Sequence, residues 1–413
     1  MSDLLKGVRV LEFAVLLNGD SLGMLLGDLG ADVIKIEGLG VGDYLRDMLG
    51  QIVPRHSPAH LQVNKNKRSL SLDLKSESGK DIFWKLMATA DVFIDGFAGS
   101  VADRLGIGFD EQKKHFPRII YCQHTGFGRF GPYSEIPTHG QMMNAGAAAV
   151  TLNADDDGFV RATQNNELMW GTSIGGDGTA AGAIHAAFHV AAALWKREKT
   201  GEGCYLDVSA TDAVISQAWI GAIYGLNQHR LTNRNDLRGV DSEAQTGARY
   251  QYYETSDKKF ILFCGIEPKF WNRFCILVER QDLIGPELEA AVVDFARDKI
   301  ELRHELQEIF LSRPQTEWVD LAIQNRLPIG PAHQGVLSLQ TDRHLNSRGI
   351  FFDGDHPIAG PFTYVGEPVI VDHEVYQLRR HAPTLGEHNF EILFELGYSV
   401  DQITELIEAE IIS

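Results

Sequence analysis

Cysteine is scarce in this chain, and its few copies are scattered. Four occur in 413 residues, with no CxxC pair and no histidine nearby at metal-ligand spacing: Cys122, Cys204, Cys264 and Cys275. A disulfide framework or a zinc site of clustered thiolates is therefore excluded as an organising feature. The pattern predicts reduced thiols in the core of a cytoplasmic protein.

Positive charge and long apolar runs are also in short supply. The chain has 38 Lys and Arg against 56 Asp and Glu, so its formal net charge is −18. This balance argues against nucleic acid or an anionic membrane as a partner, because both bind basic surfaces. The N-terminal stretch MSDLLKGVRVLEF does not resemble a secretory signal, and no window reaches the length of a membrane span. We expect a soluble, cytoplasmic protein.

One basic stretch stands out from this acidic composition. It reads NKNKR and covers residues 64–68. Because clustered lysine and arginine attract anions, the stretch predicts a place that could hold a phosphate-bearing small molecule.

Strand and helix patterns alternate along the first half of the chain. Strand patterns occur in GVRVLEF, DVIKIE, KRSLSLDL, DVFIDGF, RIIYCQHTGFG and CYLDVS, and helical patterns separate several of them. A long alanine-rich helix is expected from Thr179 to about Lys199. The alternation predicts an α/β fold with a mostly parallel sheet and helices on both faces.

The character of the sequence changes after about Asn227. A polar, turn-rich stretch is followed by RYQYYETSDKKFILFCG, which has the pattern of a hairpin around Ser256 and Asp257. We therefore expect a large α/β domain made of residues 1–226 and 345–413, and a small α+β domain made of residues 227–344.

The first strand, helix and strand raise the possibility of a dinucleotide site. Glu37 ends the second strand, where an acidic residue would bind a ribose hydroxyl. The glycines do not have the G-x-G-x-x-G spacing and fall instead at Gly19, Gly23, Gly27 and Gly30. This wider spacing suits close helix packing, so a nicotinamide dehydrogenase is not expected.

A glycine-rich stretch, MWGTSIGGDGTAAGAIH, offers two candidate reactive groups. Ser173 fits the G-x-S-x-G elbow of α/β-hydrolases, but TQNNEL, upstream of it, is not the apolar strand that such an elbow needs. Asp177 precedes the expected helix, whose free amides and dipole favour an anion, although a plain N-cap has the same pattern. The residues alone leave the role of Asp177 open and keep a serine hydrolase as a remote alternative.

Two histidines on the expected helix raise the question of a metal. His185 and His189 are four residues apart, which places them on one helix face. Since no third ligand stands at a recognisable spacing, we expect core histidines and no bound metal.

Several longer stretches together resemble one family over nearly the whole chain. They are LKGVRVLEF, LGDLGADVIKIE, NKRSLSLDLKSESGK, ADVFIDGFAGSVADRLGIG, PRIIYCQHTGFGRFGPY, AALWKREKTGEG, YLDVS and APTLGEHNFEILFELGYS. In this order they are similar to the family III CoA-transferases, or CaiB/BaiF family, which includes α-methylacyl-CoA racemase. The resemblance implies a large Rossmann-like CoA-binding domain and a small domain in an interlocked homodimer.

The resemblance also implies roles for single residues. Asp177 would be the nucleophile that attacks an acyl-CoA and carries CoA, as an aspartyl-CoA thioester, to an incoming carboxylic acid. Coenzyme A would be a cosubstrate, with no permanently bound cofactor, and its contacts would fall on Leu72, Lys75, Phe97 and Arg104. Two positions depart from the family pattern: Gly38 replaces an arginine after KIE, and Leu17 replaces a polar active-site residue.

A racemase of the same family is the alternative to a transferase. His139, Asp177 and Glu267 match the racemase histidine, its aspartate partner and the glutamate that supports the histidine. Gly140, however, replaces the aspartate that follows the racemase histidine, and the chain is longer than typical racemases. The stretch NRNDLRGVDSEAQTG also lacks the glycine-rich flap of oxalate-type transferases, which argues against that substrate class. We favour the transferase.

Overall fold

The computed structural model describes residues 3–150, 152–162, 178–232, 247–285, 293–297 and 299–413. Its described residues form two compact units, one up to Ala222 together with Asp342–Ser413, and the other within Ile223–Thr341. Among the described helices, none is both long enough and apolar enough to cross a membrane.

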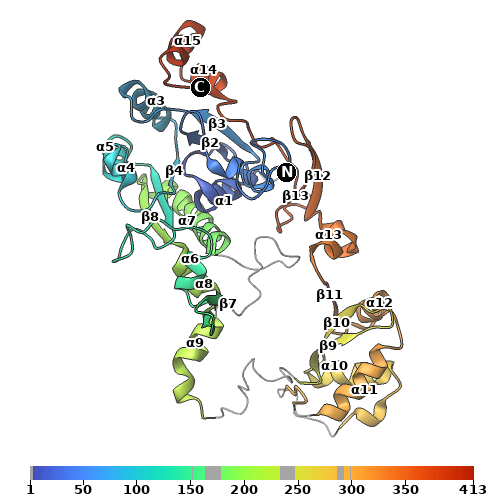
Figure 1. Ribbon diagram of the computed structural model, residues 1–413. Coiled ribbons are helices and arrows are strands. Elements are labelled where there is room, and N and C mark those ends of the chain that lie inside the picture. Colours follow the sequence, from blue (N-terminus) through green and yellow to red (C-terminus); the bar gives the residue numbers. More distant parts are fainter. Residues whose placement is uncertain (1–2, 151, 163–177, 233–246, 286–292, 298) are drawn as a thin grey trace. The chain divides into compact units, whose positions relative to one another are not determined.

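The first unit is built on a six-stranded parallel sheet in the order β3-β2-β1-β4-β5-β8 (Figure 1). Its strands are β1 (Arg9–Phe13), β2 (Asp32–Glu37), β3 (Lys67–Ser71), β4 (Val92–Asp95), β5 (Ile120–Thr125) and β8 (Cys204–Ser209). Central Val10 pairs with Val33 on one side and with Val92 on the other, both in parallel register. Parallel strands need crossover connections, which explains the alternation with helices. The expected α/β fold is confirmed.

Separate apolar cores cover the two faces of this sheet, because successive residues of a strand point to opposite faces. Val10 joins the core beneath α1 (Leu16–Asp28) and α7 (Gly178–Thr200). Leu11 joins the core beneath α3 (Glu77–Met87), α14 (Asn389–Glu395) and α15 (Val400–Glu408). Each large apolar side chain buried in this way contributes about 1.5–3 kcal/mol, so the two cores hold the sheet rigidly.

Shorter elements complete the first unit. They are α2 (Pro58–Val63), α4 (Val101–Arg104), α5 (Phe109–His115), α6 (Met142–Gly146), α8 (Ala210–Gln217) and α13 (Arg343–Arg348). Two antiparallel hairpins pair β6 (Leu152–Ala154) with β7 (Val160–Ala162) and β12 (Phe351–His356) with β13 (Gly360–Val365). Helix α9 (Trp219–Asn227) follows α8 and crosses the boundary between the units.

Two helices of the first unit match the sequence analysis closely. Helix α7 covers the stretch expected to be helical from Thr179 to Lys199. In α1, a side chain on Gly19 would collide with Ala14, and one on Gly23 with Glu12. These glycines therefore allow the helix to approach the sheet, as their spacing predicted.

The second unit is a small α+β arrangement. A three-stranded antiparallel sheet joins β9 (Tyr250–Glu254), β10 (Phe260–Cys264) and β11 (Ile329–Ala332), with β10 in the centre. The connection between β9 and β10 contains Ser256 and Asp257, so the expected hairpin is present. Helices α10 (Pro268–Leu277), α11 (Ile300–Phe310) and α12 (Gln315–Asn325) bury Phe274, Phe310 and Trp318 in its core.

Candidate active site

A pocket lies where the carboxyl ends of β1, β4 and β5 meet the starts of α1 and α7. The strand order reverses between β1 and β4, and open α/β sheets bind ligands outside the strand ends at such a switch point. The pocket has a volume of about 210 Å³. Its lining includes Leu16, Leu17, Asn18, Tyr44, Leu45, Phe97, Thr125, His139, Met143 and Thr179. We call it the switch-point pocket.

The loop that carries Phe97 is fixed by hydrogen bonds from both sides. The backbone amide of Phe97 and the Tyr121 hydroxyl donate to Asp95 at 3.0 and 2.7 Å. The Gln123 amide group donates to the backbone carbonyls of Phe97 and Gly99 at 2.9 and 3.0 Å. Burial raises the pKa of Asp95 to about 6, although its two hydrogen bonds oppose the shift. This wall of the pocket is therefore rigid.

The predicted catalytic residues are distributed unevenly over the described chain. His139 lines the switch-point pocket from the segment between β5 and α6, and its side chain is exposed. Asp177 lies outside the described residues, as does Ser173, whereas Thr179 in the first turn of α7 lines the pocket. Glu267 belongs to the second unit, where it is the N-cap residue of α10 and its side chain makes no capping hydrogen bond.

A second pocket opens at the carboxyl ends of β2 and β3. It has a volume of about 360 Å³, and Gly38, Leu72 and Lys75 are among its lining residues. The backbone amide of Leu72 donates to the carbonyl of Glu37 at 2.8 Å, which extends the pairing of the two strands into the pocket wall. The structure thus brings together Leu72 and Lys75, two of the predicted contacts with coenzyme A. We call this the nucleotide pocket.

A pair of tilted aromatic rings in contact stands between the two pockets. Phe13 lines the nucleotide pocket and Phe97 lines the switch-point pocket, and their ring centroids are 4.5 Å apart. Arg104 lines neither pocket; its guanidinium donates to the Ser100 hydroxyl at 2.8 Å, and the next residue, Leu105, lines the nucleotide pocket. A ligand that filled both pockets would pass the Phe13–Phe97 pair.

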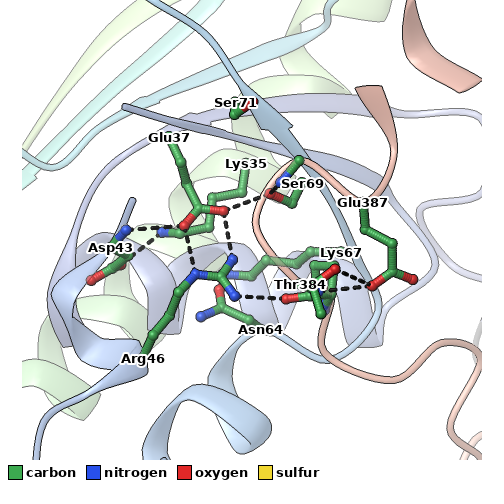
Figure 2. A network of polar contacts seen from close by, with 12 residues as sticks. Lys35, Glu37, Asp43, Arg46, Asn64, Lys67, Ser69, Ser71, Thr384 and Glu387 are labelled. Carbon is green, nitrogen blue, oxygen red and sulfur yellow. Dashed lines mark hydrogen bonds and ion pairs between the residues drawn. The ribbon is translucent and has the colours of Figure 1, made fainter. Parts of the chain in front are cut away.

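A buried network of charged side chains adjoins the pockets, and the sequence analysis missed it (Figure 2). Lys35 is fully buried and contacts Glu12, Asp20 and Asp43. Burial raises the pKa of Asp20 well above its ordinary value, and the adjacent Asp43 adds to the shift. The signal that could have found the network is Lys35 itself, a charged residue inside the expected buried strand DVIKIE.

A second ion pair of this network joins β2 to the segment after it. Figure 2 shows Arg46 facing Glu37, to which its guanidinium donates twice, at 3.0 and 2.8 Å. Burial alone would raise the pKa of Glu37, but the Arg46 charge and hydrogen bonds lower it. Arg46 also donates to the backbone carbonyl of Pro383 at 2.8 Å, so the C-terminal segment is hydrogen-bonded to the same ion pair.

The interpretation of the basic stretch at residues 64–68 as a phosphate site is wrong. Lys65 and Lys67 are fully buried, and they pair with Asp28 at 2.5 Å and Glu12 at 2.7 Å. Their charges are neutralised inside the protein and are not available to a ligand.

The expectation that His185 and His189 lie in the core is also wrong. His189 is exposed and His185 is only partly buried, and a ring nitrogen of His189 lies 2.8 Å from the carbonyl oxygen of His185. Among the described residues, no group of three or more His, Cys, Asp or Glu side chains is placed to hold a metal ion.

Comparisons with known proteins agree with this architecture. The chain is 29% identical to a formyl-CoA:oxalate CoA-transferase of Rhodopseudomonas palustris, strain BisB18, over 98% of its own length and 96% of the relative's. A second such enzyme, from Bradyrhizobium sp. strain ORS 278, is 28% identical with the same coverage.

Solved structures share the fold. A Mycobacterium tuberculosis protein is 25% identical and superposes with a TM-score of 0.72, over 94% of this chain and 98% of that one. A CaiB/BaiF family protein from Brucella suis is 24% identical, with a TM-score of 0.68 over 95% and 99% of the two chains. A sequence model of CoA-transferase family III matches residues 5–389. Because the match spans both units and both pockets, the chain belongs to CoA-transferase family III and is an enzyme of CoA transfer.

Proposed function

We propose that the enzyme moves CoA between an acyl-CoA thioester and a carboxylic acid, with Asp177 as the nucleophile. The observation that carries this proposal is the switch-point pocket, which Thr179 lines from the first turn of α7. Asp177 precedes Thr179 by two residues, so chain connectivity keeps their Cα atoms within about 7 Å. The N-terminus of a 23-residue helix also favours negative charge.

The chemistry follows from a carboxylate in that position. An oxygen of Asp177 attacks the thioester carbonyl and expels the CoA thiolate, which leaves a mixed anhydride. The thiolate then attacks the aspartyl carbonyl, so the original acid leaves as a carboxylate and CoA stays on Asp177 as a thioester. An incoming carboxylate reverses these steps and departs as the new acyl-CoA. The balance requires no water, metal or redox partner.

The two pockets support a placement for coenzyme A. Its nucleotide part would occupy the nucleotide pocket, where Lys75 offers a positive charge to phosphate, and Arg104 would approach from α4. Its pantetheine arm would pass Phe97, and the thioester would enter the switch-point pocket.

The acid partner is proposed to differ from oxalate. The relatives named above act on formyl-CoA and oxalate. The sequence between Asn233 and Gly247 lacks a glycine-rich flap of the oxalate-type enzymes, and Leu17 gives the switch-point pocket an apolar wall. We expect a less polar acid to be accepted better than oxalate.

The test of the proposal is mass spectrometry of the protein after incubation with formyl-CoA, acetyl-CoA, succinyl-CoA and a 2-methylacyl-CoA. A CoA adduct on the peptide that contains Asp177 is expected with at least one of them. Asp177→Ala should abolish both the adduct and CoA transfer, and Ser173→Ala, in the same glycine-rich stretch, should keep both. Full transfer activity in Asp177→Ala would refute the proposal.

His139 supports the racemase as a second candidate. It lines the switch-point pocket, where a base could reach the α-carbon of an acyl group. A racemase should exchange the α-proton of a 2-methylacyl-CoA in deuterated water, without a protein adduct, and should lose this exchange in His139→Ala and in Glu267→Ala. Deuterium uptake without an adduct would favour the racemase, and an adduct without uptake would favour the transferase.

The enzyme is also proposed to be a homodimer. Helix α9 is rich in apolar residues and buries none of them within the chain. Its exposed side chains include Trp219, Ile220, Ile223, Tyr224 and Leu226. A patch of this kind marks a surface for another protein. Sedimentation at nanomolar concentration should show only dimer, and a folded monomer would contradict the assignment.

A further inference from the structure

The backbone at the start of α1 has an unusual conformation at the point where it forms the wall of the switch-point pocket. Leu16 has a φ of 61°, in the left-handed region that residues other than glycine rarely adopt. Leu16, Leu17 and Asn18 all line the pocket. A strained residue keeps its conformation only where its surroundings hold it, so some contact of Leu16 must stabilise this φ angle.

Asp43 provides the contact that holds Leu16. The backbone amide of Leu16 donates to both carboxylate oxygens of Asp43, at 3.2 and 3.1 Å. The same carboxylate accepts the backbone amide of Leu45 at 2.8 Å, and Leu45 also lines the pocket. Asp43 therefore joins two separate walls of the pocket through one buried side chain.

Lys35 fixes Asp43 from the sheet. Its ammonium lies 3.0 Å from the Asp43 carboxylate (Figure 2). It also donates to the backbone carbonyl of Ala14 at 3.0 Å. Glu37, further along the same strand, accepts the backbone amide of Asp43 at 3.0 Å. The ion pair thus contacts the turn at two points, because Lys35 bonds to Ala14 and Asp43 bonds to Leu16. Lys35 itself is held in strand β2 of the central sheet. Charge-assisted hydrogen bonds of this kind are stronger and more directional than neutral ones.

We propose that Asp43, anchored by Lys35, is a positioning residue that sets the Leu16 turn and, through it, the seat of the CoA thiol and its acyl group. The inference rests on the proposed placement of coenzyme A. Asp43 does not line the switch-point pocket and so acts only through Leu16 and Leu45. The nucleotide pocket is built by other residues and should not depend on Asp43.

The test measures the affinity for two ligands and the hydrogen exchange of the Leu16 backbone amide. In Asp43→Ala, hydrogen exchange of the peptide that contains Leu16 should speed up by at least about tenfold, because its acceptor is gone. Affinity for free CoA should fall by about 10-fold or more, since small misplacements at a reacting end are costly. Affinity for adenosine 3′,5′-bisphosphate, which fills only the nucleotide pocket, should stay within about threefold of the wild type.

A matched control removes a buried carboxylate from the other end of α1. Asp28 pairs with Lys65 at 2.5 Å and accepts a hydrogen bond from Tyr376 at 2.8 Å, and none of the three lines the switch-point pocket. Asp28→Ala should lower the melting temperature but leave the exchange at Leu16 and the ratio of the two affinities unchanged. Asp43→Asn, which keeps one acceptor oxygen, should be intermediate and carries the test if Asp43→Ala does not fold.

Three outcomes would overturn the inference. The first is unchanged hydrogen exchange at Leu16 in both Asp43 variants. The second is an equal loss of affinity for CoA and for the bisphosphate in Asp43→Ala. The third is a change in the ratio of these two affinities in Asp28→Ala that is as large as the change in Asp43→Ala. None of these readouts depends on Asp177. An active Asp177→Ala variant would therefore refute the proposed mechanism and still leave the role of Asp43 to be decided by its own measurements.

Discussion

Replacing Asp95 with asparagine should make the protein more stable at neutral pH. Asp95 is only 1% exposed at the end of β4, where it accepts hydrogen bonds from Phe97 and Tyr121. Asparagine has the same shape; its oxygen can accept the Phe97 amide, and its NH₂ can donate to the oxygen of Tyr121. The substitution Asp95→Asn therefore removes a buried ionisable group and keeps both contacts.

The size of the effect follows from the pKa of Asp95. Burial raises this pKa from the ordinary 3.8 to about 6, so between these values the folded protein binds a proton that the unfolded chain has lost. Wild-type stability therefore falls as the pH rises from about 4 to about 6, and the loss is complete above that range. A difference of about 2 pH units at 1.36 kcal/mol each amounts to about 3 kcal/mol at neutral pH.

The assay is urea unfolding of wild type, Asp95→Asn and Asp257→Asn between pH 2 and pH 8. The difference in unfolding free energy should grow with pH and level off above about pH 6 in favour of the variant. Asp257 is the control of opposite sign: burial alone would raise its pKa, but hydrogen bonds from Thr255 and Gln315 lower it to about 2. Asp257→Asn should lose stability relative to wild type as the pH rises through the range between about 2 and 4. A pH-independent difference for Asp95→Asn would refute the reasoning.

Three further predictions concern glycine and serine positions. A Cβ on Gly38 meets nothing within 4 Å, so Gly38→Arg should fold. The arginine would bring a positive charge to the nucleotide pocket and should lower the Kd for CoA, measured by calorimetry. Gly38→Glu, which brings a negative charge, should raise the Kd for CoA. Gly23→Ala should destabilise the protein by about 1–3 kcal/mol in urea unfolding, because its Cβ would collide with buried Glu12. Gly27→Ala in the same helix, with its nearest neighbour at 3.5 Å, should be tolerated. Ser173→Ala should keep most CoA-transferase activity, and labelling of Ser173 by a fluorophosphonate would contradict this.

The alternation of strands and helices could be predicted from the sequence because it depends on local patterns. A strand buried on both faces is a short apolar run, and a long helix such as α7 has apolar residues repeated at a period of 3.6. The hairpin around Ser256 and Asp257 follows from turn-forming residues between two apolar runs. None of these features requires knowledge of a distant partner.

The environment of charged residues could not be predicted in the same way, because their partners are far apart in the sequence. Lys65 meets Asp28, and Lys67 meets Glu12 more than fifty residues away. From their neighbours in the sequence, these two lysines are predicted to form a cationic patch that could bind phosphate. In the fold both side chains are buried, and their charges are neutralised by carboxylates. The same limit applies to Lys35, whose partners come from three segments of the chain.

The two departures from the family pattern fall in different pockets. Gly38 lines the nucleotide pocket, and Leu17 lines the switch-point pocket. The Phe13–Phe97 ring pair stands between them, and separate hydrogen bonds support the two walls. Affinity for the nucleotide and choice of the acid can therefore change independently. A substitution at Gly38 should alter the Kd for CoA without changing which acid is preferred. A substitution at Leu17 should change which acid is preferred and leave the Kd for CoA unaltered. If Gly38→Arg changed the order of preferred acids, the two pockets would have to be coupled, and the Phe13–Phe97 pair would be the contact through which to look for that coupling.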